Sequence, residues 1–182
     1  MPDDLITGAG AGIGGASALL LVERGWKVGA YDLKGVFYGC RAVFPHLQPG
    51  AKIVNMCSTS AIYGTSDMAT YSATKFGVRG ITEALNLEWG ESGITVESIW
   101  PLYVKTGMLD NVCTDGTDRL GIRLTADDVA AEVADVVERP RGKVARLHTP
   151  VGLQTKIMFA LSHFSPVCPL VHHYTRVYYA HF

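Results

Sequence analysis

The chain of 182 residues is 48% hydrophobic and 18% charged, with a formal net charge of −1 and an isoelectric point of about 6.6. This length suits one domain with one sizeable core. The near-neutral charge, without a run of lysine or arginine, excludes an electrostatic surface for nucleic acid. No apolar run approaches the ~20 residues of a membrane span and no secretory leader opens the chain. We therefore expect a cytoplasmic protein with no stable membrane insertion.

The cysteines and histidines do not indicate a disulfide framework or a metal site. The four cysteines, at positions 40, 57, 113 and 168, are widely spread and include no C-x-x-C pair. Such spacing is typical of reduced thiols in a cytosolic protein. His172 and His173 are adjacent and so project in different directions, and no acidic or thiol partner stands at ligand spacing. We expect no bound metal.

The first part of the chain predicts a βαβ unit. A short apolar strand, 5–7, leads into the glycine-rich turn 8–14, a helix follows as far as Gly25, and a second strand covers 27–31. Backbone N–H groups in such a turn can approach a pyrophosphate, whose negative charge also suits the N-terminus of the helix. The unit therefore predicts a dinucleotide site.

Asp32 stands at the end of the second predicted strand, twenty residues after Gly12. A carboxylate at this place accepts hydrogen bonds from the ribose 2′- and 3′-hydroxyls and repels a 2′-phosphate. Asp32 therefore predicts NAD as the cofactor, with NADP less favoured.

The rest of the chain predicts alternating helices and buried strands, which is typical of a doubly wound α/β domain with a parallel sheet. Ser58 follows one of these strands and so lies at the carboxyl edge of the sheet, where ligands bind in this fold class. Thr125 is the expected N-cap of a helix with acidic residues in its first turn. The predicted helices cover 34–46, 71 to about 89 or 93, 125–137 and 156–164, and the predicted strands cover 51–57, 94–100 and 144–147.

Small residues form a stripe along the predicted helix that begins at residue 71. Ala73, Gly77, Gly80 and Ala84 recur at helical spacing. Two interpretations remain open, namely close packing on the sheet and a flat face for a helix of a second subunit.

Tyr71 and Lys75 are four residues apart on this helix, so their side chains share a face. A cation within ~4–6 Å of a phenol lowers its pKa by roughly 1–3 units from about 10. Lys75 is therefore expected to bring Tyr71 toward the range in which it exchanges protons at neutral pH. The pair predicts a general acid/base.

Together these motifs resemble the short-chain dehydrogenase/reductase family, whose fold is a Rossmann-type doubly wound sheet. The likeness runs from about residue 5 to about residue 151, and the motifs stand in the family's order. They are Thr7-Gly8-x-x-x-Gly12-Ile13-Gly14, Asp32, Asn55-x-x-Ser58, Tyr71-x-x-x-Lys75 and Pro101-x-x-Val104-x-Thr106.

The resemblance implies a catalytic set. Ser58 would bind the substrate carbonyl, Tyr71 would transfer the hydroxyl proton, and Lys75 would bind the nicotinamide ribose and lower the pKa of Tyr71. The reaction implied is hydride transfer between NAD(H) and a secondary alcohol or its ketone. The implied cofactor-binding residues are Gly8, Gly12, Ile13, Gly14, Asp32, Tyr71, Lys75, Val104 and Thr106.

The substrate is expected to be a small alcohol or carbonyl compound, and a homodimer or homotetramer is expected. An apolar pocket is indicated by Trp100, Tyr103, Met108 and Leu109. Two other functions remain open: a nucleotide-binding sensor or scaffold without turnover, and a truncated, inactive member of the family. Alcohol-dependent NADH formation would separate them.

The chain departs from the family pattern in several places, and one is before the first strand, where Asp3 and Asp4 stand in place of apolar residues. Leu102 replaces the glycine that usually follows the proline, and this change affects the expected turn over the nicotinamide. No segment resembles N-N-A-G of the fourth strand, and the family's fourth catalytic residue, an asparagine, cannot be assigned.

A break is expected at or next to residues 32–34. The sequence after Asp32 resembles the helix that follows the family's fourth strand, and the strand order 3-2-1-4 separates strands 2 and 4 by about 10 Å. The helix layer adds roughly 10 Å, whereas one or two residues span at most ~7 Å. About two βα units, on the order of 60 residues with the third and fourth strands, are therefore absent.

Either the chain joins two parts of a longer protein, or it is a deletion that repairs its sheet in another way. We expect the first, because a sheet without its fourth strand would have a hole at its centre. The domain organisation expected is an NAD-binding domain over 1–152 and a C-terminal extension over 153–182.

Overall fold

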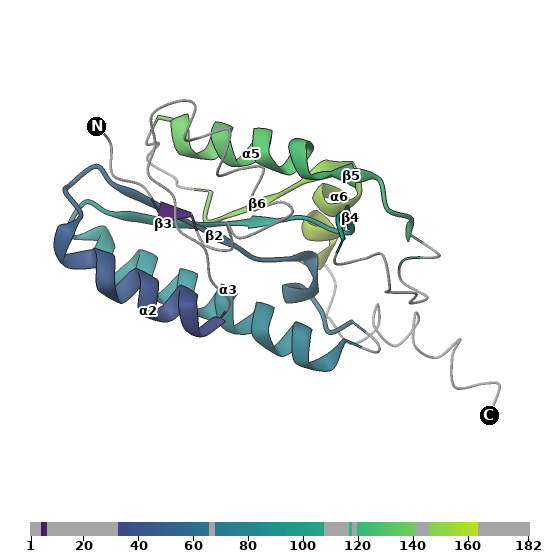
Figure 1. The fold of residues 1–182 in the computed structure, drawn as a ribbon, viewed down its shortest axis with the longest axis horizontal. Coiled ribbons are helices and arrows are strands. Elements are labelled where there is room, and N and C mark those ends of the chain that lie inside the picture. The colour runs from purple at the N-terminus through teal and green to yellow at the C-terminus, as the bar shows by residue number, and fades with distance from the viewer. Residues whose placement is uncertain are drawn as a thin grey trace.

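Four parallel strands form the central sheet, in the order β1-β2-β3-β6 (Figure 1). The computed structural model describes residues 5–6, 33–65, 68–107, 117, 120–140 and 146–163. Every neighbouring pair in the sheet is parallel, which confirms the α/β class. The strands are β1 (Leu5–Ile6), β2 (Lys52–Met56), β3 (Thr95–Trp100) and β6 (His148–Pro150).

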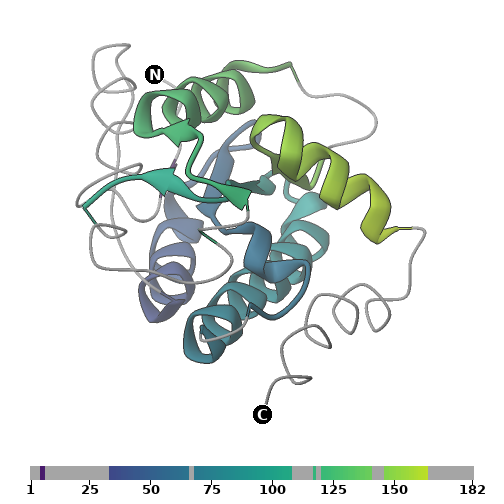
Figure 2. The ribbon, with the colours of Figure 1, turned by 90° about the vertical axis from the view of Figure 1, so that its right-hand side faces the viewer.

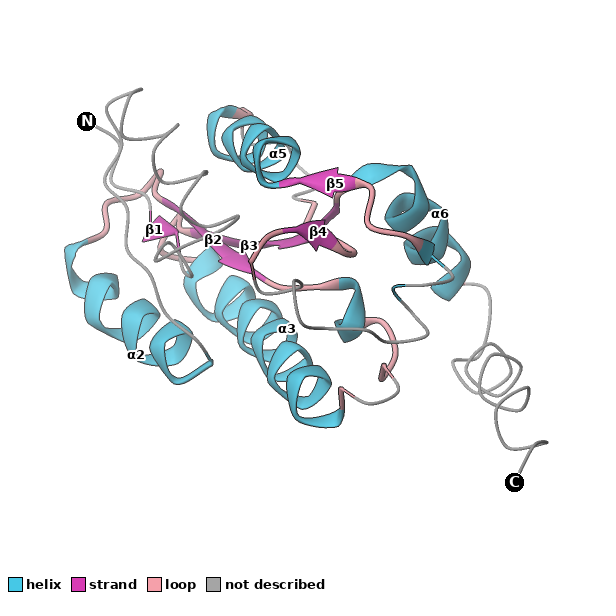
Figure 3. Cartoon of the chain, turned by 45° about the vertical axis from the view of Figure 1, so that its right-hand side comes forward, coloured by secondary structure: helices cyan, strands magenta, loops and turns pink. Residues whose placement is uncertain are grey.

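Helices cover both faces of the sheet, as expected for a doubly wound domain. Figures 1 and 3 show α5 above the sheet and both α2 and α3 below it, while α6 lies beside β5. Figure 2 shows α6 and α5 next to each other when the molecule is viewed from its right-hand side. The helices are α2 (Leu33–Val43), α3 (Ala69–Gly90), α5 (Ala126–Glu138) and α6 (Gly152–Ser162).

Two short 3₁₀ turns and one strand pair complete the described elements. The turns are η1 (Phe44–His46) and η2 (Thr59–Ala61). The sequence analysis did not predict β4 (Val104–Lys105) and β5 (Leu124–Thr125), which pair in parallel outside the main sheet.

Strand β2 divides the core into two layers because its side chains alternate between the faces. Ile53 packs with the cluster under α2 and α3, whereas Val54 packs with the cluster under α5. In β3, Val96 and Ile99 divide in the same way. Both faces of these strands carry buried apolar side chains, as expected for a parallel sheet covered on both sides.

The structure confirms the four helices predicted after residue 33 and the strands predicted over 5–7, 51–57 and 94–100 to within a few residues, but the last strand was misplaced. The helix predicted to end at Gly25 and the strand predicted over 27–31 lie outside the described residues. It was predicted over 144–147, whereas β6 begins at His148. The apolar sequence favoured the earlier segment, yet pairing with β3 selects the later one through Ser98↔His148 and Ile99↔Thr149. Tertiary pairing thus outweighs local hydrophobicity at this edge.

The expected hole at the centre of the sheet is not present. Leu5 and Ile6 of β1 pair directly with Ile53 and Val54 of β2. In the family order, the fourth strand would lie between these two strands. The described sheet is therefore continuous without the fourth strand, because β1 takes the position next to β2.

The stripe of small residues on α3 does not pack on the sheet as a unit. Ala73, Gly80 and Ala84 are exposed. Only Gly77 makes a close internal approach, because a Cβ built there would lie 2.9 Å from Leu33 Cδ1 of α2. The interpretation of the stripe as close packing on the sheet is therefore wrong.

Side chains stabilise both ends of helix α5. Thr125 forms a capping box with Asp128: the threonine Oγ1 accepts from the Asp128 N–H, and the carboxylate accepts from the Thr125 N–H. At the other end, buried Lys52 donates to the carbonyl oxygens of Val136 at 2.5 Å and Arg139 at 3.1 Å. A cation at the C-terminus complements the helix dipole.

Candidate active site

Ser58 lies where β2 ends and η2 begins. The strand ladder continues through Cys57 N–H to Ile99 O and Thr59 N–H to Pro101 O, at 2.9 and 3.0 Å. Ser58 itself has extended backbone, and its Oγ accepts from the Ser60 N–H at 3.2 Å. The side chain is held at the carboxyl edge of the sheet, where the sequence predicted it.

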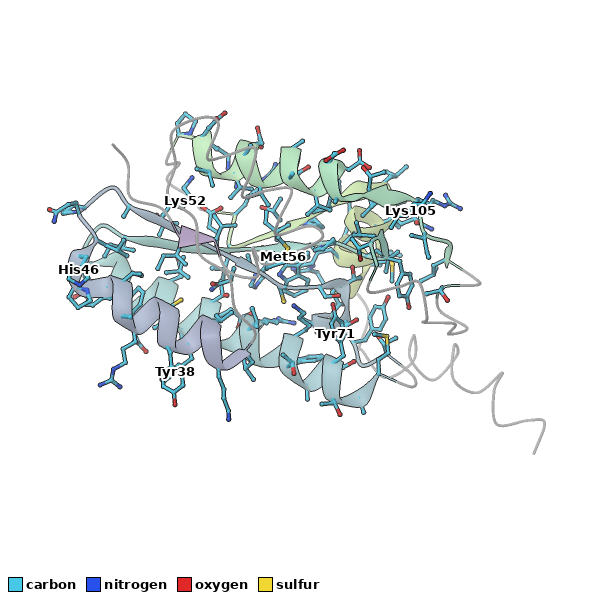
Figure 4. All side chains as sticks on the ribbon, in the orientation of Figure 1. Tyr38, His46, Lys52, Met56, Tyr71 and Lys105 are labelled. Carbon is cyan, nitrogen blue, oxygen red and sulfur yellow. The ribbon has the colours of Figure 1, made fainter. Side chains whose placement is uncertain are left out.

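Tyr71 and Lys75 reach this edge from the first turns of α3. The Lys75 Nζ lies 5.5 Å from the centroid of the Tyr71 ring and donates to Met56 O at 3.1 Å. Figure 4 shows Tyr71 close to the end of β2 that carries Met56, and Lys52 near the other end. The ammonium group thus contacts both the phenol and the last carbonyl of β2.

The environment raises the pKa of Tyr71, opposite to the expected direction. Burial is the largest cause, and electrostatic repulsion between the ionised forms of Tyr71 and of Cys57 and Tyr103 acts the same way, while hydrogen bonding with Ser58 lowers the pKa. The expected lowering by Lys75 is not found. Burial disfavours the phenolate, and the ammonium lies over the ring and bonds to Met56 O.

The pKa of Lys75 is lowered, chiefly because burial disfavours the charged ammonium. A negative charge at Cys57 acts in the opposite direction. Both members of the pair are thus shifted toward their neutral forms. Tyr71 is consequently held as a phenol, which is the form that donates a proton.

The segment after β3 brings the predicted nicotinamide contacts near the same edge. Pro101 O accepts from both the N–H and the hydroxyl of Thr59, at 3.0 and 2.9 Å, which ties this segment to η2. Val104 is buried in the α5-side cluster, and Thr106 is partly exposed. Leu102 is accommodated in this turn with partial exposure.

The donor set at this edge fits a nicotinamide nucleotide. An ammonium carries three N–H donors, and the bond from Lys75 Nζ to Met56 O uses one of them. Ribose hydroxyls are suitable acceptors for an ammonium, and Thr106 supplies a partly exposed hydroxyl for a carboxamide. Lys75 and Thr106 would therefore hold the nicotinamide side of the cofactor.

The pyrophosphate and adenine side of the predicted site lies outside the described residues. This applies to Gly8, Gly12, Ile13, Gly14 and Asp32. The same holds for Met108 and Leu109 of the expected substrate pocket, and for His172 and His173.

Trp100 does not line a substrate pocket, contrary to the prediction. Its side chain is fully buried, and its Nε1 donates to Ser98 Oγ at 2.7 Å. The ring packs against His148 and Phe159, with centroid distances of 4.6 and 5.5 Å. Trp100 is a core residue, because β3 directs it inward beneath α6.

The sequence analysis missed a set of hydroxyl residues beside Ser58. Thr65 donates from its side chain to Ser60 and from its backbone to Ser72, both at 3.0 Å. The serines and threonines between Ser58 and Tyr71 could have indicated this set, but the segment 59–69 was expected only to form a loop.

Cys40 and Cys57 are free, buried thiols. Burial raises the pKa of each to about 11, so neither thiol is a reactive nucleophile at neutral pH. Within the described ranges, no three metal-ligating side chains come together. No described helix is both long and apolar enough to cross a bilayer.

Part of the chain matches a known protein family. The short chain dehydrogenase family model matches residues 30–116. This range includes Ser58, Tyr71, Lys75, Val104 and Thr106.

Curated relatives match over the same part of the chain. The 3-alpha-(or 20-beta)-hydroxysteroid dehydrogenase of Mycobacterium tuberculosis is 45% identical over 86 residues, which are 46% of this chain and 33% of that enzyme. A putative ketoacyl reductase of Streptomyces coelicolor is 40% identical over 114 residues, 60% of this chain and 44% of that protein. The match thus spans less than half of either relative.

Solved structures share the fold at low sequence identity. A short chain dehydrogenase from Burkholderia cenocepacia in complex with NADP has a TM-score of 0.68 and 19% identity, covering 94% of this chain and 96% of that chain. A 3-ketoacyl-(acyl-carrier-protein) reductase from Brucella melitensis complexed with NADH has a TM-score of 0.70 and 20% identity, covering 82% and 96%.

Proposed function

We propose that this chain, as a member of the short-chain dehydrogenase/reductase family, interconverts a secondary alcohol and a ketone with NAD(H). The observation that carries the proposal is the convergence of Ser58, Tyr71 and Lys75 at the carboxyl end of β2. A phenol, a hydroxyl donor and a cation within one site are the groups that carbonyl reduction requires.

Ser58, Tyr71 and Lys75 have different roles in the proposed reaction. The Ser58 hydroxyl donates a hydrogen bond to the carbonyl oxygen, which stabilises the negative charge that develops on it. Tyr71 then gives its phenolic proton to that oxygen, and in the reverse direction it takes the proton back. Lys75 holds the ribose of the nucleotide and keeps a positive charge beside the phenol. When bound, the nicotinamide supplies or accepts the hydride.

The raised pKa of Tyr71 supports carbonyl reduction as the direction favoured at neutral pH. Reduction consumes a proton from the phenol, whereas oxidation of the alcohol needs the phenolate. We therefore expect the oxidation rate to increase with pH toward the pKa of Tyr71. Over the same range the reduction rate should stay level, and it should fall only at higher pH.

The cofactor we propose is NAD(H), on the ground that Asp32 is an acid at the place where the family binds the adenine ribose. A titration with NADH and NADPH tests this choice. We expect tighter binding of NADH and a smaller preference in Asp32→Asn. Tighter binding of NADPH by the unchanged protein would overturn the assignment.

The substrate class we propose is an apolar molecule with a secondary alcohol or a ketone. This choice rests on the names of the relatives, a hydroxysteroid dehydrogenase and ketoacyl reductases. Turnover assays with a steroid alcohol, a β-ketoacyl thioester and a short aliphatic alcohol would rank these classes. The highest kcat/KM is expected for one of the two apolar substrates.

We also propose a homodimer or homotetramer in the cytoplasm, formed through the outer face of α2 and α3. Exposed apolar side chains on these helices support it: Tyr38 is 64% exposed and Leu87 is 79% exposed. Figure 4 shows Tyr38 pointing away from the sheet. Light scattering tests the proposal, and a monomer at assay concentration would contradict it.

An inactive nucleotide-binding protein is the second candidate. It is favoured by the direct pairing of β1 with β2, which leaves no place between them for the strand that precedes the family's catalytic asparagine. Nucleotide binding without turnover of any alcohol or ketone would support this candidate.

A further inference from the structure

Five residues, one of them the predicted catalytic Ser58, form a ring that is closed by hydrogen bonds and by the peptide link between Tyr71 and Ser72. Ser72 follows Tyr71 in α3, and its Oγ accepts from the Thr65 N–H at 3.0 Å. The Thr65 hydroxyl contacts Ser60 Oγ at 3.0 Å, and Ser60 Oγ lies 3.4 Å from Ser58 Oγ. Ser58 in turn bonds to Tyr71, which closes the ring at the residue next to Ser72.

The ring restrains the loop between η2 and α3. The Thr65 backbone is attached to α3 through Ser72, which is 5% exposed, and the Thr65 side chain is attached to η2 through Ser60. The carbonyl of Thr65 also accepts from the Met68 N–H at 3.2 Å. Thr65 is thus held on both sides, so its hydroxyl is directed at Ser60.

Counting donors and acceptors identifies the direction of the hydroxyl bonds that leaves the Ser58 proton available. Each serine or threonine hydroxyl has one proton and two acceptor positions. Ser58 Oγ already accepts from the Ser60 N–H at 3.2 Å. If Thr65 donates to Ser60 and Ser60 donates to Ser58, both acceptor positions of Ser58 are used and its own proton is available for another oxygen.

The reverse direction does not suit the reaction. If Ser58 donated to Ser60, its proton would not be available for a substrate carbonyl. Ser60 would then receive two protons, from Ser58 and Thr65, and its own hydroxyl would need a further acceptor. The contact of 3.4 Å is long for an O–H···O bond, so rotation of the two serine protons costs little.

We propose that Ser60 and Thr65 are positioning residues that orient the Ser58 hydroxyl as a donor, through the series Thr65 to Ser60 to Ser58 to the substrate carbonyl oxygen. The inference rests on the proposed function of this site. Hydrogen bonds in series polarise one another, so donation by Ser60 makes Ser58 a stronger donor. In the absence of substrate, the Ser58 proton is directed at the Tyr71 oxygen.

The first test uses Ser60→Ala and Thr65→Val in the full chain, with Thr65→Ser as the conservative variant. Thr74→Val is the matched control, because the Thr74 hydroxyl donates to Thr70 O at 2.9 Å, outside the ring. We expect Ser60→Ala and Thr65→Val to lower kcat by about threefold to tenfold with little change in KM for NADH. Thr65→Ser should restore the rate.

Because the bonds act in series, the double variant should lose no more than Ser60→Ala alone. Unchanged kcat in Ser60→Ala, or a double variant whose losses multiply, would overturn the proposal. Thermal unfolding of each variant shows whether a loss of rate reflects loss of fold.

A second readout does not depend on turnover. The pKa of Tyr71 can be followed by NMR in protein labelled with ¹³C at the tyrosine ring carbon that bears the hydroxyl. A weaker Ser58 donor stabilises the phenolate less, so the Tyr71 pKa should rise in Ser60→Ala and Thr65→Val but not in Thr74→Val. An unchanged Tyr71 pKa in both ring variants would overturn the inference, whereas absence of turnover in the unmodified chain would overturn the proposed function.

Discussion

Tyr71 combines the position proposed for the general acid/base with an environment that opposes its ionisation. The residue type and the spacing to Lys75 were evident from the sequence, and the helix that places them together was predicted. The direction of the pKa shift was not evident, because both the burial of Tyr71 and its electrostatic interaction with Tyr103 depend on segments remote in sequence. Spacing therefore identifies the pair, while the tertiary structure determines its protonation.

Replacement of Tyr71 by phenylalanine should abolish turnover and leave NADH binding nearly unchanged. The variant loses only the proton-transferring oxygen, and loss of a general acid lowers rates by at least about 100-fold. Steady-state kinetics and a fluorescence titration with NADH measure the two effects. Lys75→Ala is the comparison and should impair both rate and binding. A Tyr71→Phe protein with most of its activity would contradict the assigned role.

A second polar cluster, at His148, links stability to pH. His148 Nε2 lies 3.0 Å from Glu83 Oε1 and its Nδ1 lies 2.8 Å from Ser98 Oγ. Burial lowers the pKa of His148, Arg79 and His163 act in the same direction, and Glu83 partly opposes the shift. No sequence pattern indicated this cluster, because its members lie on α3, β3 and β6, which are remote from one another in sequence.

The unfolded chain binds a proton at this histidine more readily than the folded chain does, since the folded pKa lies below the ordinary value of 6.5. The contribution of His148 to the free energy of unfolding should therefore be fully present above about pH 6.5 and should decrease as the pH falls below that value. His148→Gln, which cannot titrate, should show a shallower decrease in urea unfolding across this range. Equal slopes for the two proteins would show that His148 remains as easily protonated in the folded chain.

At the scale of elements, local signals were most reliable where a cap or an apolar period marked a helix. Thr125 was predicted as an N-cap, and the structure adds its reciprocal partner, Asp128. The pair β4–β5 was missed, because two-residue strands have no period in sequence and arise only from tertiary pairing. Stabilisation of the other end of α5 by Lys52 was missed for the same reason, since the lysine is remote from that helix in sequence.

Thr125→Ala should destabilise the domain by about 1 kcal/mol, because the N-terminal N–H groups of α5 lose their side-chain acceptor. The change is measured as a lower urea midpoint with the same slope. Thr125→Ser, which keeps the capping hydroxyl, should remain close to the unmodified protein. A midpoint unaffected by alanine would mean that the box contributes nothing to stability in solution.

At the scale of the whole molecule, the fold class followed from the sequence, but the closure of the sheet did not. The family order led us to expect a gap between β1 and β2, whereas the backbone groups of Leu5–Ile6 pair with those of Ile53–Val54. Unpaired strand edges in a buried sheet are costly, so strands next to a vacant position pair with each other. No sequence pattern encodes such a neighbour.

We nevertheless propose that the native protein carries a further segment at or next to residues 32–34. The segments before and after residues 32–34 resemble elements that are not directly connected in the family's fold. Intact mass spectrometry of the protein from its natural source decides the matter. We expect a mass several kilodaltons above 19.6 kDa, and a value of 19.6 kDa would establish the shorter chain with its continuous sheet as the native form.

The measurement that tests the central claim most directly is NADH formation from NAD⁺ and secondary alcohols. The assay compares the unmodified protein with Tyr71→Phe, using steroid, β-hydroxyacyl and short aliphatic alcohols. Our account predicts NADH formation by the unmodified protein with at least one alcohol, increasing with pH, and none above background for Tyr71→Phe. No NADH formation with any alcohol class, or equal rates for the two proteins, would contradict it.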